Sequence, residues 1–531
     1  MTEPARNLFR LKAVVWGVFA ALMLYNLVAI WVLNGGRFEY TLDDTYIHLA
    51  VSENIADGHY GVNSQEYSAP SSSIVWPFIL ALFNWTGLDR FVPFFLNLIA
   101  GIGVMALMMN FVARVFEPGR DRQRRVIFVL VSVLLMLTGN VVGLIYGGME
   151  HSWQVLVSLL MLAGLWEEQR TGRVTWWLAL AVTVAPLIRY DTMAVTAPTL
   201  LVLWARGYRR TTLISGGIIA AYLLGFSLFL LSIDQGALPA SVTAKSHVVA
   251  GASFGLFSLP RALFSSLLEN VFSWHGGWFI ILLLALWGGA LRAARRGETG
   301  DRLLAIWAAI ALLLHLIAGR MGVFNRYEIY AAMVGLLTVL VLWRDILRRI
   351  VDESPLVMSA LFVTLAFGLT VLYWPTSFIT PLAANNIYEQ QYQMHRFITD
   401  YYQGDVAVSD LGWPSYRNRN YVLDLWGLAS REALEYRLED EDGVDWMNLL
   451  MTEHDVRAAI LFEERFDIPA NWQKLCRLTL GKTRIAPAES SVRFYALDDE
   501  TAARILALME DYRDTLPDGT KLVCRSWGNV D

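Results

Sequence analysis

Long apolar stretches set the strongest limit on the fold of this chain. Twelve of them lie between residues 13 and 374, and most reach or approach the roughly 20 residues that an α-helix needs to cross a bilayer. In order they are 13–33, 74–88, 91–113, 126–146, 152–166, 174–188, 192–205, 211–232, 274–292, 302–319, 327–343 and 356–374. Only 17% of the 531 residues are charged, whereas soluble domains average about 25%. The sequence therefore predicts a multi-pass helical membrane protein.

The charge balance changes where the apolar stretches end, at Trp374. Residues 375–531 hold 26 acidic and 16 basic side chains, a net charge of −10, which leaves 22 acidic and 27 basic side chains, a net of +5, in residues 1–374. We predict a membrane region over 1–374 and a soluble domain over 375–531. Strand-like segments alternate with amphipathic helices in the second region, which favours an α/β or α+β domain. The overall charge of −5 gives no reason to expect a nucleic-acid partner.

Basic residues in the short loops predict the orientation in the membrane, because Lys and Arg concentrate on the cytoplasmic side. They cluster at 114–125, 170–173, 206–210, 292–296 and 344–349. If all these clusters are inside, the outer side carries segments 34–73, 147–151, 189–191, 233–273 and 320–326 and the C-terminal domain. An odd number of crossings is then required. We expect about 11 transmembrane helices, with either 74–88 or part of 91–113 re-entrant or lying flat.

The two cysteines, Cys476 and Cys524, fall in the domain expected outside. In that compartment they form one disulfide or remain two free thiols, and the sequence leaves both open.

The first outer loop, 34–73, contains the adjacent acids Asp43 and Asp44. Ile47 and Val51 follow at helical spacing, which predicts a short amphipathic helix on the membrane surface. Acids in a first helical turn suit the helix dipole. The two aspartates therefore either cap this helix or take part in chemistry.

Other outer turns carry polar residues at helix ends. A charge at the bilayer centre costs at least about 2.5–3.5 kcal/mol, so charges kept at one membrane face are paired or functional. Each residue alone is equally well explained as an interfacial anchor or a local ion pair. Acids and bases from five loops on one face instead predict a shared polar cavity. The candidate binding residues are His48, Glu150, His151, Arg189, Asp191, Lys245, His247, Arg320, Arg326 and Tyr327.

Such a cavity combines groups that transfer from a lipid phosphate requires. Carboxylates can remove a proton from an acceptor hydroxyl. Arg and Lys side chains can hold a phosphate and stabilise the charge that develops as it departs. The aspartate pair is also a candidate for holding a divalent cation, although the sequence has no dedicated set of metal ligands.

Several motifs carry a resemblance to a known family. The stretch Leu42-Asp43-Asp44-Thr45-Tyr46-Ile47, with 54–58, 67–73 and Trp76 after it, resembles the first periplasmic loop of GT-C glycosyltransferases. More narrowly, it is similar to the bacterial branch that includes the mycobacterial arabinofuranosyltransferases of the AftB type. Further matches follow in the family's order at Gly148-Met149-Glu150, Arg189-Tyr190-Asp191-Thr192, Leu238-Pro239 with Ala244-Lys245, 406–412 and 422–428.

The resemblance implies a GT-C fold in a bacterial inner membrane, with the active site and C-terminal domain facing the periplasm. It also implies a polyprenyl-phosphate sugar donor and a catalytic aspartate in the first loop, Asp43 before Asp44. The chain departs from the family in having Asp191 where Glu is usual and Arg320 near a position that is often acidic. Donor or acceptor can therefore differ from those of the arabinan enzymes.

The leading hypothesis is transfer of a sugar, arabinofuranose or another pentose, from polyprenyl phosphate to an extracytoplasmic glycan or protein. Membrane lipid and that acceptor are then the partners. A transporter or flippase of lipid-linked sugars would use the same carboxylates for proton coupling, but it predicts charges at mid-membrane and internal repeats. A non-catalytic scaffold is the third reading.

Overall fold

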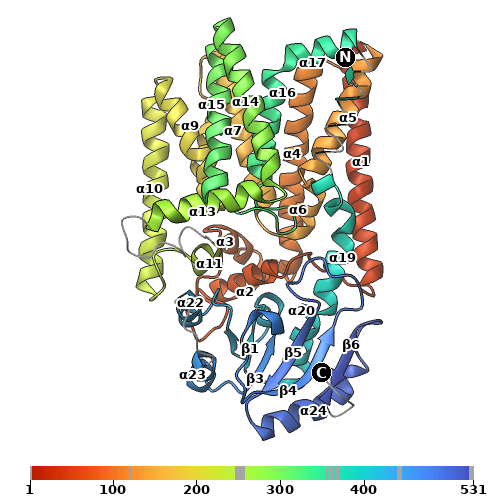
Figure 1. Cartoon of the computed structure of the whole chain (residues 1–531), viewed down its shortest axis with the longest axis vertical. Coiled ribbons are helices and arrows are strands. Elements are labelled where there is room, and N and C mark those ends of the chain that lie inside the picture. The colour runs from red at the N-terminus through yellow and green to blue at the C-terminus, as the bar shows by residue number, and fades with distance from the viewer. Residues whose placement is uncertain are drawn as a thin grey trace.

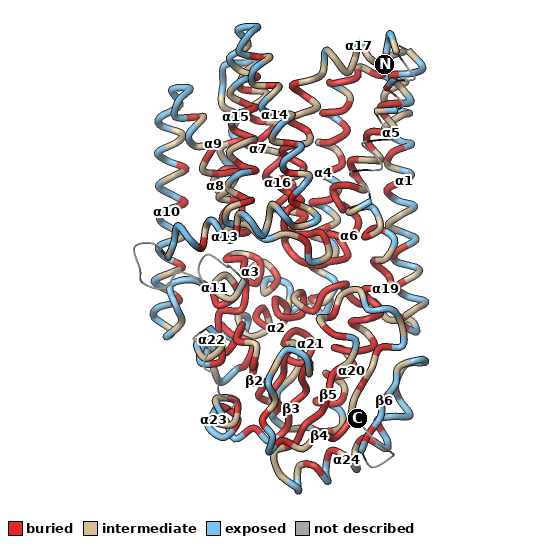
Figure 2. The backbone as a smooth tube through the Cα atoms, viewed as in Figure 1, coloured by how far each residue is buried: buried red, intermediate tan, exposed pale blue. Residues whose placement is uncertain are grey.

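A bundle of apolar helices stands on a smaller domain of mixed helices and strands (Figure 1). The structure is a computed structural model, and it describes residues 3–119, 121–245, 258–354, 371–438 and 445–525, together with Val357, Met358, Ala360, Leu361, Thr364 and Gly368. The buried residues run through the interior of both parts (Figure 2).

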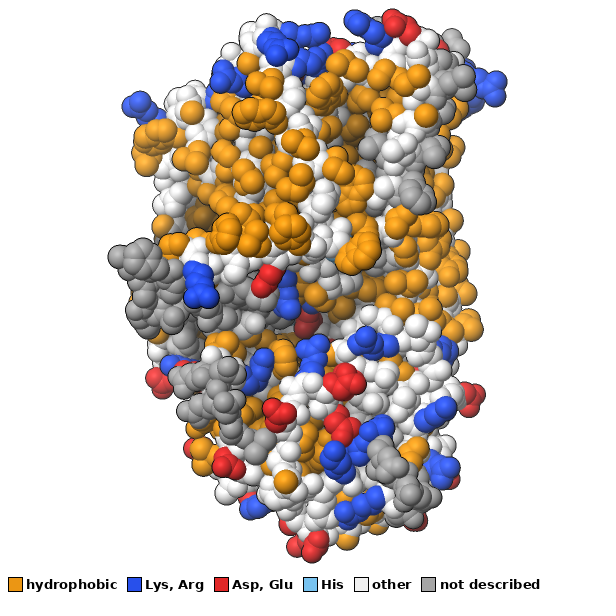
Figure 3. Space-filling model, viewed as in Figure 1, with side chains coloured by type: hydrophobic (Ala, Val, Ile, Leu, Met, Phe, Trp, Pro, Cys, Tyr) orange, Lys and Arg blue, Asp and Glu red, His pale blue; other side chains and the backbone are white. Residues whose placement is uncertain are grey.

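The bundle is built from helices whose outer faces are apolar. Its helices are α1 Glu3–Leu33, α4 Val92–Phe116, α5 Arg122–Thr138, α6 Val141–Gly147, α7 His151–Thr171, α8 Trp176–Ile188, α9 Met193–Ala205, α10 Arg209–Ser232, α13 Ser258–Phe272, α14 Gly276–Arg296, α15 Thr299–Ala318, α16 Ile329–Leu342 and α17 Arg344–Glu353. Large apolar side chains such as Trp31, Leu224 and Trp287 are more than half exposed. Figure 3 shows a broad apolar surface on the visible face of the bundle, with Lys and Arg side chains gathered at the end far from the smaller domain. This surface is the kind that lipid covers.

Six helices of the described chain are long and apolar enough to span a membrane, or seven if α16 and α17, which are bent by 64°, form one span. The stretch 74–88 forms only α3, Trp76–Ala81, and the 3-10 turn η1, Asn84–Thr86, which are too short to cross. The neighbouring stretch 91–113 lies in the 25-residue α4. Of the two stretches between which the sequence left the choice open, 91–113 is therefore the one that is long enough to cross, and 74–88 is the one that is not. Nine of the 19 residues of the last expected span, 356–374, lie outside the described residues, and eleven spans stays a prediction.

The predicted helix of the first loop is α2, Asp44–Ala56. The helix itself is confirmed, but its expected place on the membrane surface is wrong. Eight consecutive residues, 45–52, are buried, because α2 lies between the bundle and the C-terminal domain (Figure 1). It packs against α3 on one side and against the short helix α21, Gly412–Ser415, on the other.

The C-terminal domain contains one six-stranded sheet, as the alternation of helices and strands predicts. The strand order is β2-β1-β3-β5-β4-β6, in which β2, β1 and β3 are parallel and the remaining pairs are antiparallel. The strands are β1 Val406–Val408, β2 Val422–Asp424, β3 Ala458–Leu461, β4 Gln473–Thr479, β5 Ser491–Ala496 and β6 Lys521–Cys524. A disulfide between Cys476 and Cys524 joins β4 to β6.

Helices surround this sheet and connect it to the bundle. They are α19 Thr376–Glu389, α20 Gln391–Arg396 with the π-helical turn η4 Phe397–Tyr402, α22 Arg431–Leu438, α23 Asp445–Glu453 and α24 Asp499–Arg513. The amide of Asn385 in α19 donates a hydrogen bond to the carbonyl of Leu33 at the end of α1, at 3.1 Å. In the other direction, Asn26 of α1 donates to the carbonyl of Ser377, at 3.0 Å. These contacts fix the domain at one end of the bundle.

Candidate active site

A cavity of about 370 Å³ lies among residues at the domain-facing end of the bundle. It is bounded by the 3-10 turn η3, Tyr190–Thr192, by the start of α9, by the end of α15 and by the short helix α11, Ala240–Lys245. Four of the ten predicted binding residues line it. They are Arg189, Asp191, Arg320 and Tyr327.

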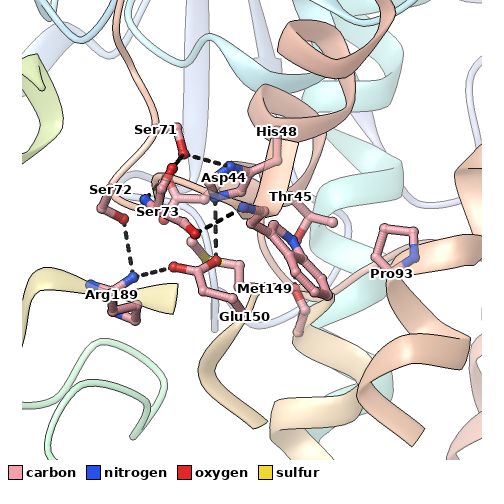
Figure 4. A network of polar contacts seen from close by, with 12 residues as sticks. Asp44, Thr45, His48, Ser71, Ser72, Ser73, Pro93, Met149, Glu150 and Arg189 are labelled. Carbon is pink, nitrogen blue, oxygen red and sulfur yellow. Dashed lines mark hydrogen bonds and ion pairs between the residues drawn. The ribbon is translucent and has the colours of Figure 1, made fainter. Parts of the chain in front are cut away.

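Arg189 is the centre of a buried ionic network (Figure 4). Its Nη1 donates to Glu150 Oε1 at 2.5 Å and to Ser72 Oγ at 3.0 Å. Its Nε and Nη2 donate to Asp191 Oδ2 at 3.2 and 2.9 Å. Glu150 is completely buried, so the guanidinium group supplies the charge that makes an ionised carboxylate tolerable there.

The network continues from Glu150 to α2. His48 Nε2 lies 3.6 Å from Glu150 Oε2, and His48 Nδ1 is 3.2 Å from Ser71 Oγ. Figure 4 shows His48 and Glu150 pointing toward each other, with the serines Ser71 to Ser73 beside them. The predicted gathering of His48, Glu150, Arg189 and Asp191 is therefore present in the structure.

Three guanidinium groups surround the ring of Tyr327. Their central carbons lie 4.8 Å from the ring centroid for Arg326, 5.6 Å for Arg189 and 5.9 Å for Arg320. Arg326 Nη2 also donates to Asp44 Oδ2 at 2.5 Å. Arg320, by contrast, has no ion pair with any described residue, and its residue is exposed. Arg320 thus places a guanidinium group that has no carboxylate partner among the described residues at the cavity wall, where it can bind an anionic group.

The two aspartates of the first loop point to different partners. Asp43 is only 7% exposed and accepts hydrogen bonds from the main-chain nitrogens of Gly412, at 2.6 Å, and Trp413, at 2.9 Å. The Asp44 side chain is 23% exposed and faces Arg326. Asp43 occupies the N-cap position of α2 but makes no capping hydrogen bond, so the helix-cap reading does not describe it. Neither aspartate lines the cavity, and Asp44 is connected to it through Arg326.

A third acid, Asp410, joins this pair from the C-terminal domain. Its Oδ2 accepts a hydrogen bond from Gln391 Nε2 at 2.7 Å. Burial raises the pKa of Asp410 to about 7, and the charge of Asp44 adds to that rise. Burial also raises the pKa of Asp43 well above its ordinary value, with Asp410 as the next cause. Asp43 therefore favours its protonated form near neutral pH, where Asp410 is about half protonated.

The remaining predicted residues are placed as follows. His151 is buried, with its ring 5.6 Å from that of Tyr327 in an edge-on arrangement. Lys245 ends α11, but its side chain is outside the described part of the chain, as is all of His247. No group of three or more His, Cys, Asp or Glu among the described residues is arranged to hold a metal ion.

Sequence reasoning did not assign Ser71, Ser72, Gln391 or Asp410 to the site. The serines stand in a Ser-Ser-Ser run just after Ala69-Pro70 in the first outer loop, and that run was a usable signal. Asp410 lies two residues after the buried strand β1, in a segment already singled out by its resemblance. Gln391 had no distinguishing pattern. Trp413 is buried and stacked on Tyr46, with ring centroids 4.3 Å apart.

Comparison with known proteins gives one sequence match. The model of a domain of unknown function (DUF8728) matches residues 385–495, which include β1 to β4, β5 except its last residue, and Asp410. Comparison with curated proteins gives no match.

Solved structures give low-level similarities. An oligosaccharyltransferase from Archaeoglobus fulgidus in its apo form is 11% identical, with a TM-score of 0.43, over 83% of this chain and 69% of that one. ArnT from Cupriavidus metallidurans bound to undecaprenyl phosphate is 12% identical, with a TM-score of 0.44, over 92% and 99%. AglB from A. fulgidus, in complex with an inhibitory peptide and a dolichol-phosphate, is 9% identical, with a TM-score of 0.41, over 95% and 75%. Likenesses of this degree do not carry an activity from those proteins to this chain.

Proposed function

We propose that this chain is a membrane glycosyltransferase of the GT-C type. It moves one sugar from a polyprenyl-phosphate donor to an extracytoplasmic acceptor. The observation that carries the proposal is the arginine cluster around Tyr327, in which Arg320 has no carboxylate partner among the described residues and lines a cavity. A guanidinium group left without a counter-charge favours an anionic ligand such as the phosphate of a lipid donor.

The charge distribution supports a site on the periplasmic face of a bacterial inner membrane. Lys and Arg gather at the end of the bundle opposite the C-terminal domain (Figure 3), and that end is then cytoplasmic. The Cys476–Cys524 disulfide suits an oxidising compartment on the other side. The cavity lies at the domain-facing end of the bundle. The phosphate of a lipid donor in the periplasmic leaflet would lie at the same level.

In the proposed reaction, Asp44 acts as the general base. It takes the proton of the acceptor hydroxyl while that oxygen bonds to the anomeric carbon of the sugar. The bond between this carbon and the phosphate oxygen breaks, and polyprenyl phosphate leaves with the bonding electrons. Arg320, with Arg189 and Arg326, stabilises the negative charge that develops on the phosphate. Arg326 beside Asp44 favours the ionised carboxylate that a base requires.

Asp43, which the sequence ranks first, has a different role in this proposal. Both of its oxygens already accept main-chain hydrogen bonds from the C-terminal domain, and its raised pKa favours the protonated form. We assign it as a positioning residue that fixes the start of α2 and hence the direction of Asp44. The transferred sugar, arabinofuranose or another pentose, and the glycan or protein acceptor rest on the sequence resemblance alone.

The test uses purified full-length protein in proteoliposomes with radiolabelled polyprenyl-phosphate pentose and a cell-envelope glycan fraction. Asp44→Asn should lower the transfer rate by about 10²–10⁴-fold, because a neutral amide cannot take the proton. The matched control is Asp345→Asn, which changes an aspartate paired with Arg292 at the opposite end of the bundle. Wild-type transfer by Asp44→Asn would refute the assignment. Movement of intact donor across the bilayer without release of polyprenyl phosphate would favour the flippase alternative.

A further inference from the structure

A second hollow lies between the first loop and the C-terminal domain. This polar groove has a volume of about 680 Å³ and shares no lining residue with the cavity described above. One wall is the C-terminal end of α2 with the loop after it, and the other is the segment that follows α21. Its lining includes Asn54, Gln65, Ser415, Asn418, Arg419 and Asn420.

Amide side chains hold the floor of the groove in a fixed shape. Asn63, which is 8% exposed, donates to the carbonyl of Val422 and accepts from its main-chain nitrogen, both at 3.0 Å. Asn418 Oδ1 accepts from the main-chain nitrogen of Asn420 at 2.9 Å. The Asn63 side chain thus joins the first loop to the main chain of β2, so the groove is preformed.

Other polar groups in the groove have no partner within the described chain. Asp57, Gln65 and Arg419 are exposed and make no side-chain hydrogen bond or ion pair with a described residue. Ser415 is 4% exposed, and its hydroxyl oxygen is buried without a hydrogen-bond partner among the described residues. A buried hydroxyl without a partner costs free energy, and the exposed side chains of Asp57, Gln65 and Arg419 are the groups that a ligand in the groove can reach.

The composition of the lining indicates the chemistry of that ligand. Six of the fifteen lining residues are Asn or Gln, whose carboxamides both donate and accept hydrogen bonds. The acids Glu53 and Asp57 balance the bases Arg417 and Arg419, so the groove has no net charge to attract a phosphate or a cation. Its volume lies within the range of about 300–1,000 Å³ typical of small-ligand pockets. These properties suit a neutral ligand rich in hydroxyl groups.

The groove and the carboxylates are at opposite ends of the same helix. Asp44 begins α2, and Asn54 lies ten residues later, about 15 Å along the axis at 1.5 Å per residue. The segment 410–421 runs beside it, from Asp410 and Gly412 near Asp43 to Asn418 and Asn420 in the groove. Only an extended ligand can occupy the groove and reach Asp44 at once.

We propose that this groove binds a neutral oligosaccharide. Within the transfer reaction proposed above, on which this second part rests, the groove holds the units of the acceptor that are distant from the hydroxyl being glycosylated.

Binding is tested directly, without turnover. Purified full-length protein is applied to an array of neutral and acidic oligosaccharides of one to eight units. The wild type should bind neutral oligosaccharides of several units, and the double variant Gln65→Ala/Arg419→Ala should bind them about tenfold more weakly, because two hydrogen-bonding side chains are lost. The matched control Arg457→Ala removes an exposed arginine of the same domain that pairs with Asp455 outside the groove, and it should bind as the wild type does.

Two results overturn the proposal. One is wild-type protein that binds no neutral oligosaccharide on the array. The other is binding that the double variant retains in full. Asp44→Asn separates this proposal from the proposed function, since it should lose transfer and keep array binding. Array binding by a protein that transfers no sugar would retain the groove as an oligosaccharide site and reject only the glycosyltransferase assignment.

Discussion

The two ends of the helix bundle use arginine in different ways. At the end far from the C-terminal domain, a polar hollow is lined by Arg114, Arg170, Arg344 and Arg348, and every one of them has a carboxylate partner. At the domain-facing end, Arg189 has two carboxylate partners, Arg326 has one and Arg320 has none among the described residues.

We propose that this difference separates a structural use of arginine at the far end from a functional use at the domain-facing end. Ion pairs at the far end neutralise the arginines that line this hollow. At the domain-facing end, the positive groups converge on one ring and border a cavity. We expect a bound anion to pair with Arg320, which has no carboxylate partner among the described residues.

Replacing Arg320 should have the largest effect of the changes that test this difference between the two ends. Arg320→Ala should reduce kcat/KM for the lipid donor by about 10²–10³-fold, as loss of one charge-stabilising donor does. Arg320→Lys should recover part of that loss, since it keeps the charge but not the planar fork. The matched variant Arg348→Ala, whose partner is Glu117 at the far end, should transfer sugar at the wild-type rate. Equal losses in the Arg320 and Arg348 variants would show that the two ends do not differ.

Arg189 and Arg206 allow the same comparison for stability. Each is paired with a glutamate that is no more than 1% exposed, Glu150 or Glu168. Arg189→Met should destabilise the protein by about 3–5 kcal/mol, because it leaves a buried carboxylate without its partner. Arg206→Met should cost less, because Arg206 is one-third exposed to solvent.

The double variants distinguish structure from chemistry. In thermal unfolding, Arg189→Met/Glu150→Gln and Arg206→Met/Glu168→Gln should each recover stability relative to the single arginine variant. Only Arg206→Met/Glu168→Gln should also transfer sugar at the wild-type rate. Full activity in Arg189→Met/Glu150→Gln would mean that this pair serves folding alone.

The sequence predicts the parts of the molecule that depend on local pattern. Apolar stretches of sufficient length predict the bundle, and charges confined to helix ends predict that His48, Glu150, Arg189 and Asp191 converge. The place of α2 was predicted wrongly. The helix is covered by α21, which lies more than 350 residues later in the chain. A local sequence pattern cannot predict such a contact.

The roles proposed for Asp43 and Asp44 also depend on a contact with residues that are distant in the sequence. Successive residues at the start of a helix point about 100° apart, so only one can face the arginine cluster. Which one does so depends on the hydrogen bonds from Gly412 and Trp413 to Asp43. Asp410 was likewise hidden, because its proximity to Asp43 arises only when the C-terminal domain docks.

Asp410 gives the domain interface an expected pH dependence. Its pKa is raised to about 7 by burial in the folded protein, whereas an unfolded aspartate titrates near pH 4. Between these values the folded state binds more protons than the unfolded state, so this group's contribution to stability falls as the pH rises from about 4 to 7. The wild type should therefore unfold at a lower temperature at pH 8 than at pH 5.5, and Asp410→Asn should lessen that difference. The measurement is differential scanning fluorimetry, with Asp455→Asn, an exposed acid of the same domain, as the control. If Asp410→Asn has the same pH dependence of unfolding temperature as the wild type, Asp410 does not contribute to the pH dependence of stability.

Removal of divalent cations is the smallest expected effect, and it tests what supplies positive charge at the domain-facing end. Both oxygens of Asp43 accept main-chain hydrogen bonds, and Asp44 is paired with Arg326, so the aspartates have little capacity left for a metal ion. If the guanidinium groups perform the task, transfer in EDTA should stay within about twofold of transfer in Mg²⁺. Excess Mg²⁺ should likewise fail to rescue Arg320→Ala. Loss of activity in EDTA that Mg²⁺ or Mn²⁺ restores would instead make the aspartate pair a cation site, and the positive charge that distinguishes this end of the bundle would then come from an ion as well as from arginine.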